Sequence, residues 1–202
     1  MNDGWHMALI AFVAMITPGP NNILVTQAAA TGTRLGTVAV IAAIVGGSMM
    51  MLAAAQMGVS SLLAASPGLH LALKLVSAAV LVGIGIAMMT RSSPAGRSDR
   101  NYPVAPLSVL GFQFVNPKGW ALMLAVGAMD VPVGRALLIV ASVTLASMSV
   151  CAMAGVALGR MITDARRRKF FTMSMGALLA ISAPLVLIEY EVVDRRVGGG
   201  FD

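Results

Sequence analysis

Long apolar stretches alternate with short polar connections along almost the whole chain. Six of these stretches are about 20 residues long or longer, which is the length that an α-helix needs to cross the hydrocarbon core of a bilayer. They cover residues 5–29, 36–59, 69–89, 107–129, 133–158 and 170–188. The pattern predicts an all-α integral membrane protein with six transmembrane helices.

The connection between the third and fourth stretches is the longest, and it divides the chain into two halves of three spans each. Because three is an odd number, two halves with the same internal order must lie in opposite orientations, which makes them inverted repeats. We therefore predict a first three-helix repeat over residues 1–90, a cytoplasmic linker over 91–106, a second three-helix repeat over 107–189 and a disordered tail over 190–202.

Proline, glycine and asparagine interrupt the first stretch of each half at a similar depth. The interruptions read Thr17-Pro18-Gly19-Pro20-Asn21-Asn22 and Gln113-Phe114-Val115-Asn116-Pro117-Lys118-Gly119. A proline inside a helix removes one N–H donor and clashes with the preceding turn, so we predict that helices 1 and 4 are broken here. Broken backbone inside a bilayer is tolerated where it faces protein or a wet cavity. Breaks at matching places in two halves therefore point to a substrate site.

The half-helix after each break directs its N-terminus into the gap. Such an N-terminus carries partial positive charge and unpaired N–H groups, which favour a carboxylate. The amides of Asn21, Asn22 and Asn116 lie beside the breaks and can bind the ends of a ligand or hold the unwound backbone. An alternative is that the prolines only kink the two helices. Because the breaks match in depth and both are flanked by asparagine, we favour the site.

Lys118 is the one charged residue that falls well inside an apolar stretch. A cation at the centre of a bilayer costs about 2.5–3.5 kcal/mol on insertion scales, which favours a functional role with a defined partner. No Asp or Glu lies deep in a stretch, so the partner is the carboxylate of a substrate, the unwound carbonyls near Pro18 or the asparagine side chains. The alternative is that Lys118 snorkels to a nearby surface.

Composition and charge agree with a protein that is solvated by lipid. Hydrophobic residues make up 58% of the 202 residues and charged residues 11%, whereas a soluble domain has about half and about a quarter. The net charge of +6 is spread over short clusters between apolar stretches, which indicates membrane topology and attraction to anionic lipid, with no nucleic acid as partner.

The basic residues also predict the orientation of the spans. If the N-terminus lies outside, nine cations fall on the inner side and four on the outer side. The inner cations are Arg34, Arg91, Arg97, Arg100, Arg160, Arg166, Arg167, Arg168 and Lys169, and the outer ones are Lys74, Arg135, Arg195 and Arg196. Positive charge accumulates on the cytoplasmic side, so we predict that both termini are periplasmic.

Few residues in this chain have the chemistry of an enzyme or a metal protein. One cysteine, Cys151, and two peripheral histidines provide neither a nucleophile with its base nor a metal cluster, so we expect no enzymatic activity, no cofactor and no metal. Residues 1–6 lack the basic cluster of a cleavable signal, and we expect the first stretch to be retained. A non-enzymatic scaffold or a channel-like pore stays an alternative to a transporter, and the small-residue helix faces would also allow a homodimer.

Three segments resemble the lysine exporter (LysE/RhtB) family. The segment Thr17-Pro18-Gly19-Pro20-Asn21 is similar to the TPGPN motif of that family, and residues 111–118, which read GFQFVNPK, are similar to its second motif. Ser66-Pro67 followed by Leu73-Lys74-Leu75 looks like the start of the family's third span. The similarity extends to about Glu189, and the wording of the two motifs is closest to the branch that exports cysteine and O-acetylserine.

The resemblance implies a secondary transporter that exports small amino acids or their derivatives across a bacterial inner membrane. Many relatives carry an acid after the glycine pair of span 2, where this chain has Gly46-Gly47-Ser48, and this difference fits a neutral substrate better than lysine. The candidate substrate-binding residues are Thr17, Pro18, Gly19, Pro20, Asn21, Asn22, Gln113, Asn116, Pro117 and Lys118.

Overall fold

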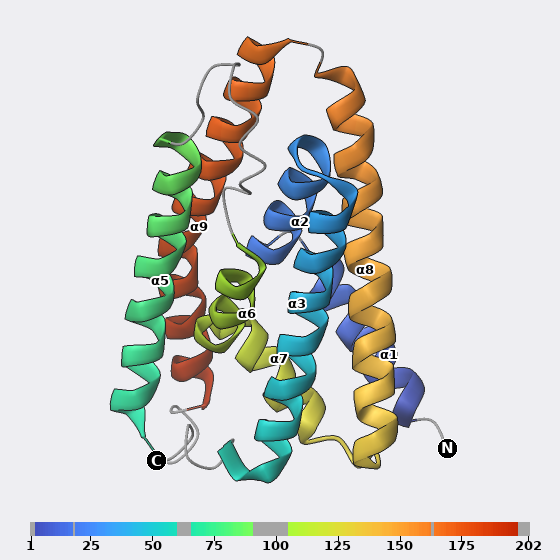
Figure 1. Ribbon diagram of the computed structural model, residues 1–202. Helices are drawn as coiled ribbons and strands as arrows, with labels where there is room; N and C mark the ends of the chain where they lie inside the picture. Colours follow the sequence, from blue (N-terminus) through green and yellow to red (C-terminus); the bar gives the residue numbers. More distant parts are fainter. Residues whose placement is uncertain (1–2, 18, 60–65, 91–104, 163, 198–202) are drawn as a thin grey trace.

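The computed structural model describes residues 3–17, 19–59, 66–90, 105–162 and 164–197, and the secondary structure of these residues is helical apart from short turns (Figure 1). Pro18, most of the predicted linker (91–104) and the last five residues of the predicted tail (198–202) lie outside the described residues. The predicted all-α architecture is thus confirmed for the part of the chain that the structure describes.

In the first half of the chain, the described residues form four α-helices and one turn of π-helix. These elements are α1 (Asp3–Ile16), α2 (Pro20–Thr31), α3 (Arg34–Ala54), η1 (Ala55–Val59) and α5 (Pro67–Thr90). Thr33 caps α3, because its hydroxyl oxygen accepts a hydrogen bond from the Gly36 N–H over 3.2 Å. Gly58, inside η1, departs from helical geometry with a φ of 102°, a conformation that glycine adopts without steric cost.

The second half contains four further helices, and the last of them is longer than expected. They are α6 (Pro106–Val115), α7 (Pro117–Gly127), α8 (Val133–Met161) and α9 (Ala165–Val197). Because α9 continues to Val197, the predicted disordered tail is helical over its first eight residues. The charged residues of this segment are compatible with a helix, and the run of glycines that disfavours one begins only at Gly198.

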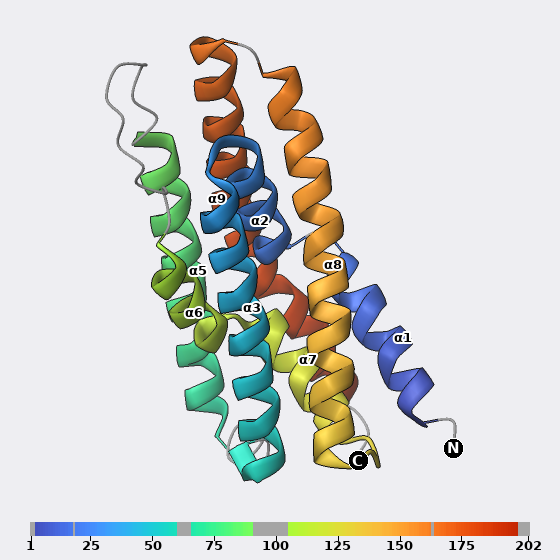
Figure 2. The same cartoon turned by 45° about the vertical axis from the view of Figure 1, so that its right-hand side comes forward.

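Both predicted helix breaks are present. The axes of α1 and α2 differ by 62° across the short break at residues 17–19, and Figure 2 shows α1 leading away from α2. The second break is at Asn116, which has an extended conformation between α6 and α7, with φ −80° and ψ 105°. Pro20 and Pro117 each begin the helix that follows, where a missing N–H costs no intrahelical bond.

Length and hydropathy identify three helical segments in the described residues that can cross a membrane, and a fourth if the bent pair α1–α2 counts as one span. The three are Arg34–Gly58, Leu71–Thr90 and Val133–Met161. The helix α6 is apolar but too short to cross by itself. A multi-pass membrane protein follows from these segments, and the full set of six spans stays a prediction.

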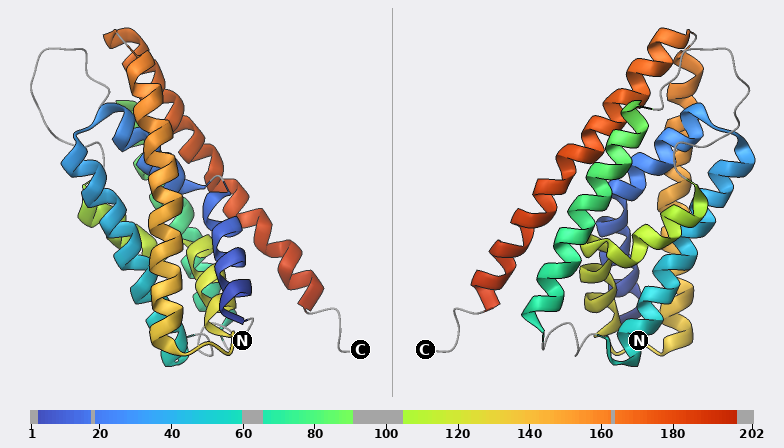
Figure 3. Two further views of the ribbon diagram at one scale, coloured as in Figure 1. Left: turned by 90° about the vertical axis from the view of Figure 1, so that its right-hand side faces the viewer. Right: turned by 60° about the vertical axis from the view of Figure 1, so that its left-hand side comes forward.

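The helices form an elongated bundle with two distinct ends (Figures 1 and 3). The α2–α3 turn, the end of α5 and the α8–α9 connection lie at one end, which we call the Arg34 end. The start of α1, η1 and the α7–α8 connection lie at the other, which we call the Asp130 end. Within the bundle, α5 lies beside α9, while α8 contacts α1, α2 and α3, and α3 contacts α6 and α7.

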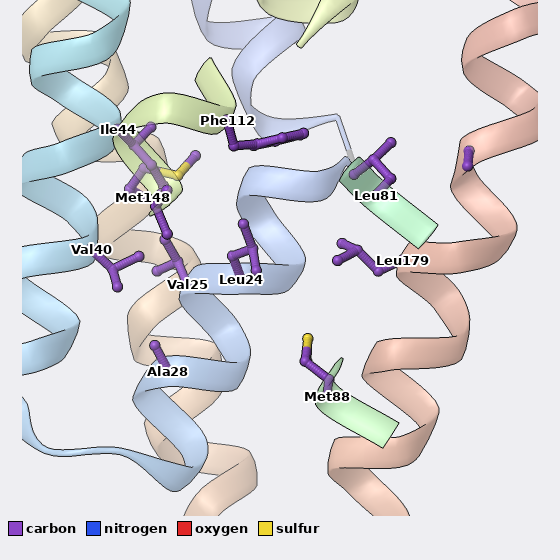
Figure 4. Close-up of a cluster of buried hydrophobic side chains, with 12 residues drawn as sticks. Leu24, Val25, Ala28, Val40, Ile44, Leu81, Met88, Phe112, Met148 and Leu179 are labelled. Atoms are coloured by element: carbon purple, nitrogen blue, oxygen red, sulfur yellow. The ribbon is translucent and has the colours of Figure 1, made fainter. Parts of the chain in front are cut away.

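Two clusters of buried apolar side chains hold the bundle, one in each half of its length. The Arg34-side cluster, shown in Figure 4, combines α2, α3, α5, α6, α8 and α9. Its members include Leu24, Val25, Ile44, Phe112 and Met148. The Asp130-side cluster combines α1, α3, α7 and α8, and its members include Met7, Met51, Trp120, Met123 and Val140. The two helix breaks lie between these clusters.

Glycines let two pairs of helices approach closely. A Cβ atom on Gly85 of α5 would lie 2.5 Å from the carbonyl oxygen of Gly176 on α9, and a Cβ on Gly176 would lie 2.6 Å from that of Gly85. On α8, a Cβ on Gly155 or Gly159 would collide with the backbone of α2. Small residues at such crossings are typical of helix packing in membranes, where close contact of backbones provides the attraction.

We expect Gly85→Ile to destabilise the folded protein, because its side chain would force α5 away from α9. Overpacking of this kind costs about 1–3 kcal/mol, and here the opposing atom is backbone. The measurement is the temperature at which the detergent-solubilised protein loses its monodisperse elution peak. The matched control is Gly83→Ile, because a Cβ on Gly83 has open space around it. Equal stability of the two variants would contradict the packing of α5 against α9.

Candidate functional site

A cavity of about 40 Å³ lies where the two breaks meet. Seven of its lining residues are predicted substrate-binding residues: Gly19, Pro20, Asn21, Asn22, Gln113, Asn116 and Lys118. The remaining wall comes from α1, α3, α7 and α8 through Ala14, Met15, Ser48, Met51, Gly119, Leu122, Met123 and Met148. The cavity therefore combines a polar side at the breaks with an apolar side rich in methionine.

Asn22 holds the first break together. Its side-chain Nδ2 lies 3.2 Å from the Met15 carbonyl oxygen, 3.2 Å from that of Ile16 and 3.4 Å from that of Thr17. These are carbonyls that the end of α1 leaves without an intrahelical partner, and the two N–H donors of one amide group in the next helix are shared among them. Asn22 thus binds the unwound backbone, one of the two roles expected for the asparagines.

Trp120 and Gln113 stabilise the second break. The Trp120 indole N–H donates to the carbonyl oxygen of Phe114 over 2.8 Å, across the junction of α6 and α7. Gln113 Nε2 lies 3.2 Å from the Val109 carbonyl oxygen, and the Asn116 N–H donates to the Gln113 carbonyl over 3.1 Å. At each break, freed carbonyls thus accept hydrogen bonds from within the bundle, which backbone at membrane depth requires.

A reciprocal pair of amides, which we call the amide link, joins the two breaks. Asn21 Nδ2 donates to Gln113 Oε1 over 3.0 Å, and Gln113 Nε2 donates to Asn21 Oδ1 over 3.0 Å. Gly47 of α3 makes room for this pair, because a Cβ at that position would lie 2.5 Å from Gln113 Cγ. Gln113 is buried, so the amide link is sheltered from water.

Lys118 provides a second connection between the breaks, which we call the ammonium link. Its Nζ donates to the Thr17 carbonyl oxygen over 3.1 Å. Of the three kinds of partner predicted for Lys118, the structure thus shows one, an unwound carbonyl next to Pro18. Gly19 also faces the ammonium group, because a Cβ on Gly19 would lie 3.3 Å from Nζ. Lys118 is the one charged residue among the described residues that line the cavity.

Two helix N-termini and one side-chain oxygen offer binding groups to the cavity. Neither Gly19, which precedes α2, nor Asn116, which precedes α7, caps its helix with a side-chain hydrogen bond. In the part of the chain that the structure describes, the buried Asn116 Oδ1 has no hydrogen-bond partner. Together with the Lys118 ammonium group, the site thus offers donors suited to an anion and one acceptor suited to a cation or a hydroxyl.

The structure brings most of the predicted site residues to one place. Pro117 begins α7 without lining the cavity, Thr17 reaches it only through the ammonium link, and Pro18 lies outside the described residues. The other seven residues line the cavity. Their role in binding a substrate stays a prediction.

Sequence reasoning missed the methionine wall and the role of Trp120. Met15, Met51, Met123 and Met148 come from four different helices, and methionine in an apolar stretch is normally interpreted as packing. Met15 is held by the Thr144 hydroxyl, which lies 3.6 Å from its sulfur. The available signal was position, since Met15 and Met123 each lie within two turns of a break. Identification of the other two needed the arrangement of the helices.

Broken helices that enclose a polar cavity inside an apolar bundle define the class of membrane transport proteins with a central site. Within this class, the profile of the LysE type translocator family matches residues 12–189 of the chain. The chain therefore belongs to this family, which implies membrane transport of amino acids or related compounds. The family resemblance predicted from the two motifs is confirmed.

One curated relative is an uncharacterized membrane protein of Pseudomonas aeruginosa, which is 34% identical over 90 residues. The aligned part covers 44% of this chain and 41% of the relative, so the match spans less than half the length of either protein. No solved structure matches the chain.

Proposed function

We propose that this protein is a secondary transporter that exports small neutral amino acids, or their derivatives, across the bacterial inner membrane by alternating access. The observation that carries the proposal is the cavity between the two breaks, where Lys118, two uncapped helix N-termini and the unpartnered Asn116 Oδ1 come together. These groups match the two charged ends that every amino acid carries.

The carboxylate of the substrate binds at Lys118. An ammonium group and helix N-terminal N–H groups both favour an anion, and their effect is larger in a site that is partly shielded from water. The substrate's amino group then interacts with Asn116 Oδ1, an acceptor that costs free energy as long as it stays buried without a partner. The wall around this site includes the other predicted residues that line the cavity, which are Gly19, Pro20, Asn21, Asn22 and Gln113.

The wall of the cavity favours a substrate with an uncharged side chain. Four methionines and Leu122 face the ligand, and the described lining residues include no acid that would pair with a cationic side chain. Lys118 would in addition repel such a side chain. Methionine is flexible and polarisable and adapts to ligands of different shape, so the wall is suited to several small neutral side chains.

The helix contacts support two inverted repeats of three spans each. In such a repeat, α1 corresponds to α6, α2 to α7, α3 to α8 and α5 to α9. The α1–α8 contact then corresponds to α6–α3, and the α2–α8 contact to α7–α3; all four contacts are present. The α5–α9 and α3–α8 contacts each join two corresponding helices, as a two-fold relation between the halves requires. Rocking of one half against the other around the shared cavity would expose the site to one side of the membrane at a time.

Charge supports an orientation with the Arg34 end in the cytoplasm and both termini in the periplasm. Arg34, Arg160 and the run Arg166–Lys169 are exposed at the Arg34 end. Arg168 donates from Nη2 to the Thr31 carbonyl oxygen over 2.9 Å, which joins the first turn of α9 to the end of α2. Positive charge on short loops is retained on the cytoplasmic side.

The test is the profile of amino acids that accumulate outside bacterial cells fed a mixture of dipeptides. Cells that overproduce the protein should export one or more neutral amino acids faster than cells with an empty vector, and the rate should saturate with internal concentration. Export of cationic amino acids alone would contradict the neutral substrate. A rate that never saturates, or ionic currents in a planar bilayer, would favour the channel-like pore.

A further inference from the structure

The amide link and the ammonium link lie on opposite sides of the two breaks. Asn21 is in the first turn of α2 and Gln113 in the last turn of α6, so the amide link joins the two half-helices that lead to the Arg34 end. Thr17 directly follows α1 and Lys118 is in the first turn of α7, so the ammonium link joins the half-helices that lead to the Asp130 end.

The two links also occupy related positions in the two halves. Each starts at the residue directly after a helix-initiating proline, Asn21 in one half and Lys118 in the other. Each ends three or four residues before the proline of the opposite half, at Thr17 or Gln113. Under the inverted repeat of the proposed function, such equivalent positions fall on opposite sides of the membrane midplane.

Each link is backed by one of the two apolar clusters. Phe112, the neighbour of Gln113, and Leu24, one turn after Asn21, belong to the Arg34-side cluster. Trp120, two residues after Lys118, belongs to the Asp130-side cluster, and Met15, two residues before Thr17, packs against it. The cavity lies between the clusters, with Met148 from one and Met51 and Met123 from the other in its wall.

We propose that the amide link is the inner closure of the transport path and the ammonium link the outer closure. The proposal rests on the proposed function for the terms inner and outer. Each link ties a half-helix of one repeat to a half-helix of the other, so the halves move apart on one side only when the link on that side breaks. Asn21 and Gln113 are thereby assigned to closing the path, in addition to lining the cavity.

Accessibility of a single reporter cysteine tests the two closures without added substrate. The reporter is Ser48→Cys in a Cys151→Ser background, because Ser48 is buried and lines the cavity. It is labelled with a membrane-impermeant maleimide, from the outer face in intact cells with a permeabilised outer membrane and from the inner face in inverted membrane vesicles. Exposed positions at the two ends, Leu35→Cys and Met57→Cys, report which end faces which side.

Gln113→Leu should raise the rate of labelling from the inner face, and Lys118→Met should raise the rate from the outer face. The expected rise is roughly twofold to tenfold for each hydrogen bond that is lost. Labelling from the opposite face should stay unchanged or fall in each case. Asn21→Leu, which breaks the amide link from its other end, should reproduce the effect of Gln113→Leu and shows whether a result comes from misfolding of one variant.

An increase from the same face in both variants, or no increase in either, would overturn the proposal. Labelling of Leu35→Cys from the outside would instead show that the orientation in the membrane is reversed. The amide link would then be the outer closure and the ammonium link the inner one, and the two variants would still act on opposite faces. Because this experiment measures labelling and not export, the two proposals can fail separately. The closures can be refuted while export is observed, and they can be supported while export is absent.

Discussion

Replacement of Lys118 by methionine is expected to lower amino-acid export roughly tenfold or more while the protein stays folded in the membrane. A hydrogen bond to a charged group contributes about 1.5–3 kcal/mol, and the variant loses this interaction with the substrate's carboxylate. Every 1.4 kcal/mol corresponds to a factor of ten in binding. Methionine has a similar length and removes a charge from membrane depth, so insertion itself should not suffer. The measurement is the initial export rate of dipeptide-fed cells, divided by the amount of inserted protein.

Two variants separate the position of the charge from its mere presence. Lys118→Arg keeps a cation at the site and should retain part of the activity, whereas Lys169→Met removes an exposed lysine at the Arg34 end and should export normally. Normal export by Lys118→Met would refute the assignment of the carboxylate site. Equal loss in Lys169→Met would mean that overall charge, and not the cavity, decides the rate.

Asn22→Leu is expected to reduce the stability of the protein by about 1–3 kcal/mol, with a corresponding loss of export. The side chains have nearly the same size, but leucine cannot donate to the Met15, Ile16 and Thr17 carbonyl oxygens at the end of α1. Unsatisfied acceptors at membrane depth carry a penalty of that order, because lipid offers them no replacement donor. The measurement is thermal unfolding of the purified protein in detergent.

The control for Asn22 is Ser149→Ala, which also removes a polar group from a predicted span. The Ser149 hydroxyl donates only within its own helix, to the Leu145 carbonyl over 2.7 Å, so its loss should leave stability and export close to those of the unaltered protein. If Asn22→Leu proved as stable as Ser149→Ala, the first break would not depend on the Asn22 amide.

The positions of the breaks could be predicted from the sequence because their causes are local. Proline excludes the N–H that a continuing helix needs, and Pro20 and Pro117 begin new helices where this omission is harmless. The end of α9 was predicted too early, because no local signal marks it in the sequence. The segment 190–197 is charged, and hydropathy alone separated it from the apolar stretch, although nothing in it prevents a helix.

The partners of the site residues could not be predicted, because they are set by tertiary packing. The amide link joins residues 92 positions apart, and the ammonium link residues 101 positions apart. Gln113 was interpreted as a substrate ligand because it belongs to the second interruption. Only the approach of α6 to α2, with room provided by Gly47 on α3, gives its amide a partner in Asn21.

The central claim is that a substrate binds in the cavity between the two broken helices, and protection of a cysteine placed there tests it most directly. Ala14 lines the cavity, so Ala14→Cys in the Cys151→Ser background gives a thiol whose rate of labelling is followed while the amino acid identified by the export screen is titrated. The account predicts a saturable fall in that rate with the amino acid, no fall with its carboxamide, and an unchanged rate at Met57→Cys outside the cavity. A rate at Ala14→Cys that stays constant at concentrations which saturate export would contradict it.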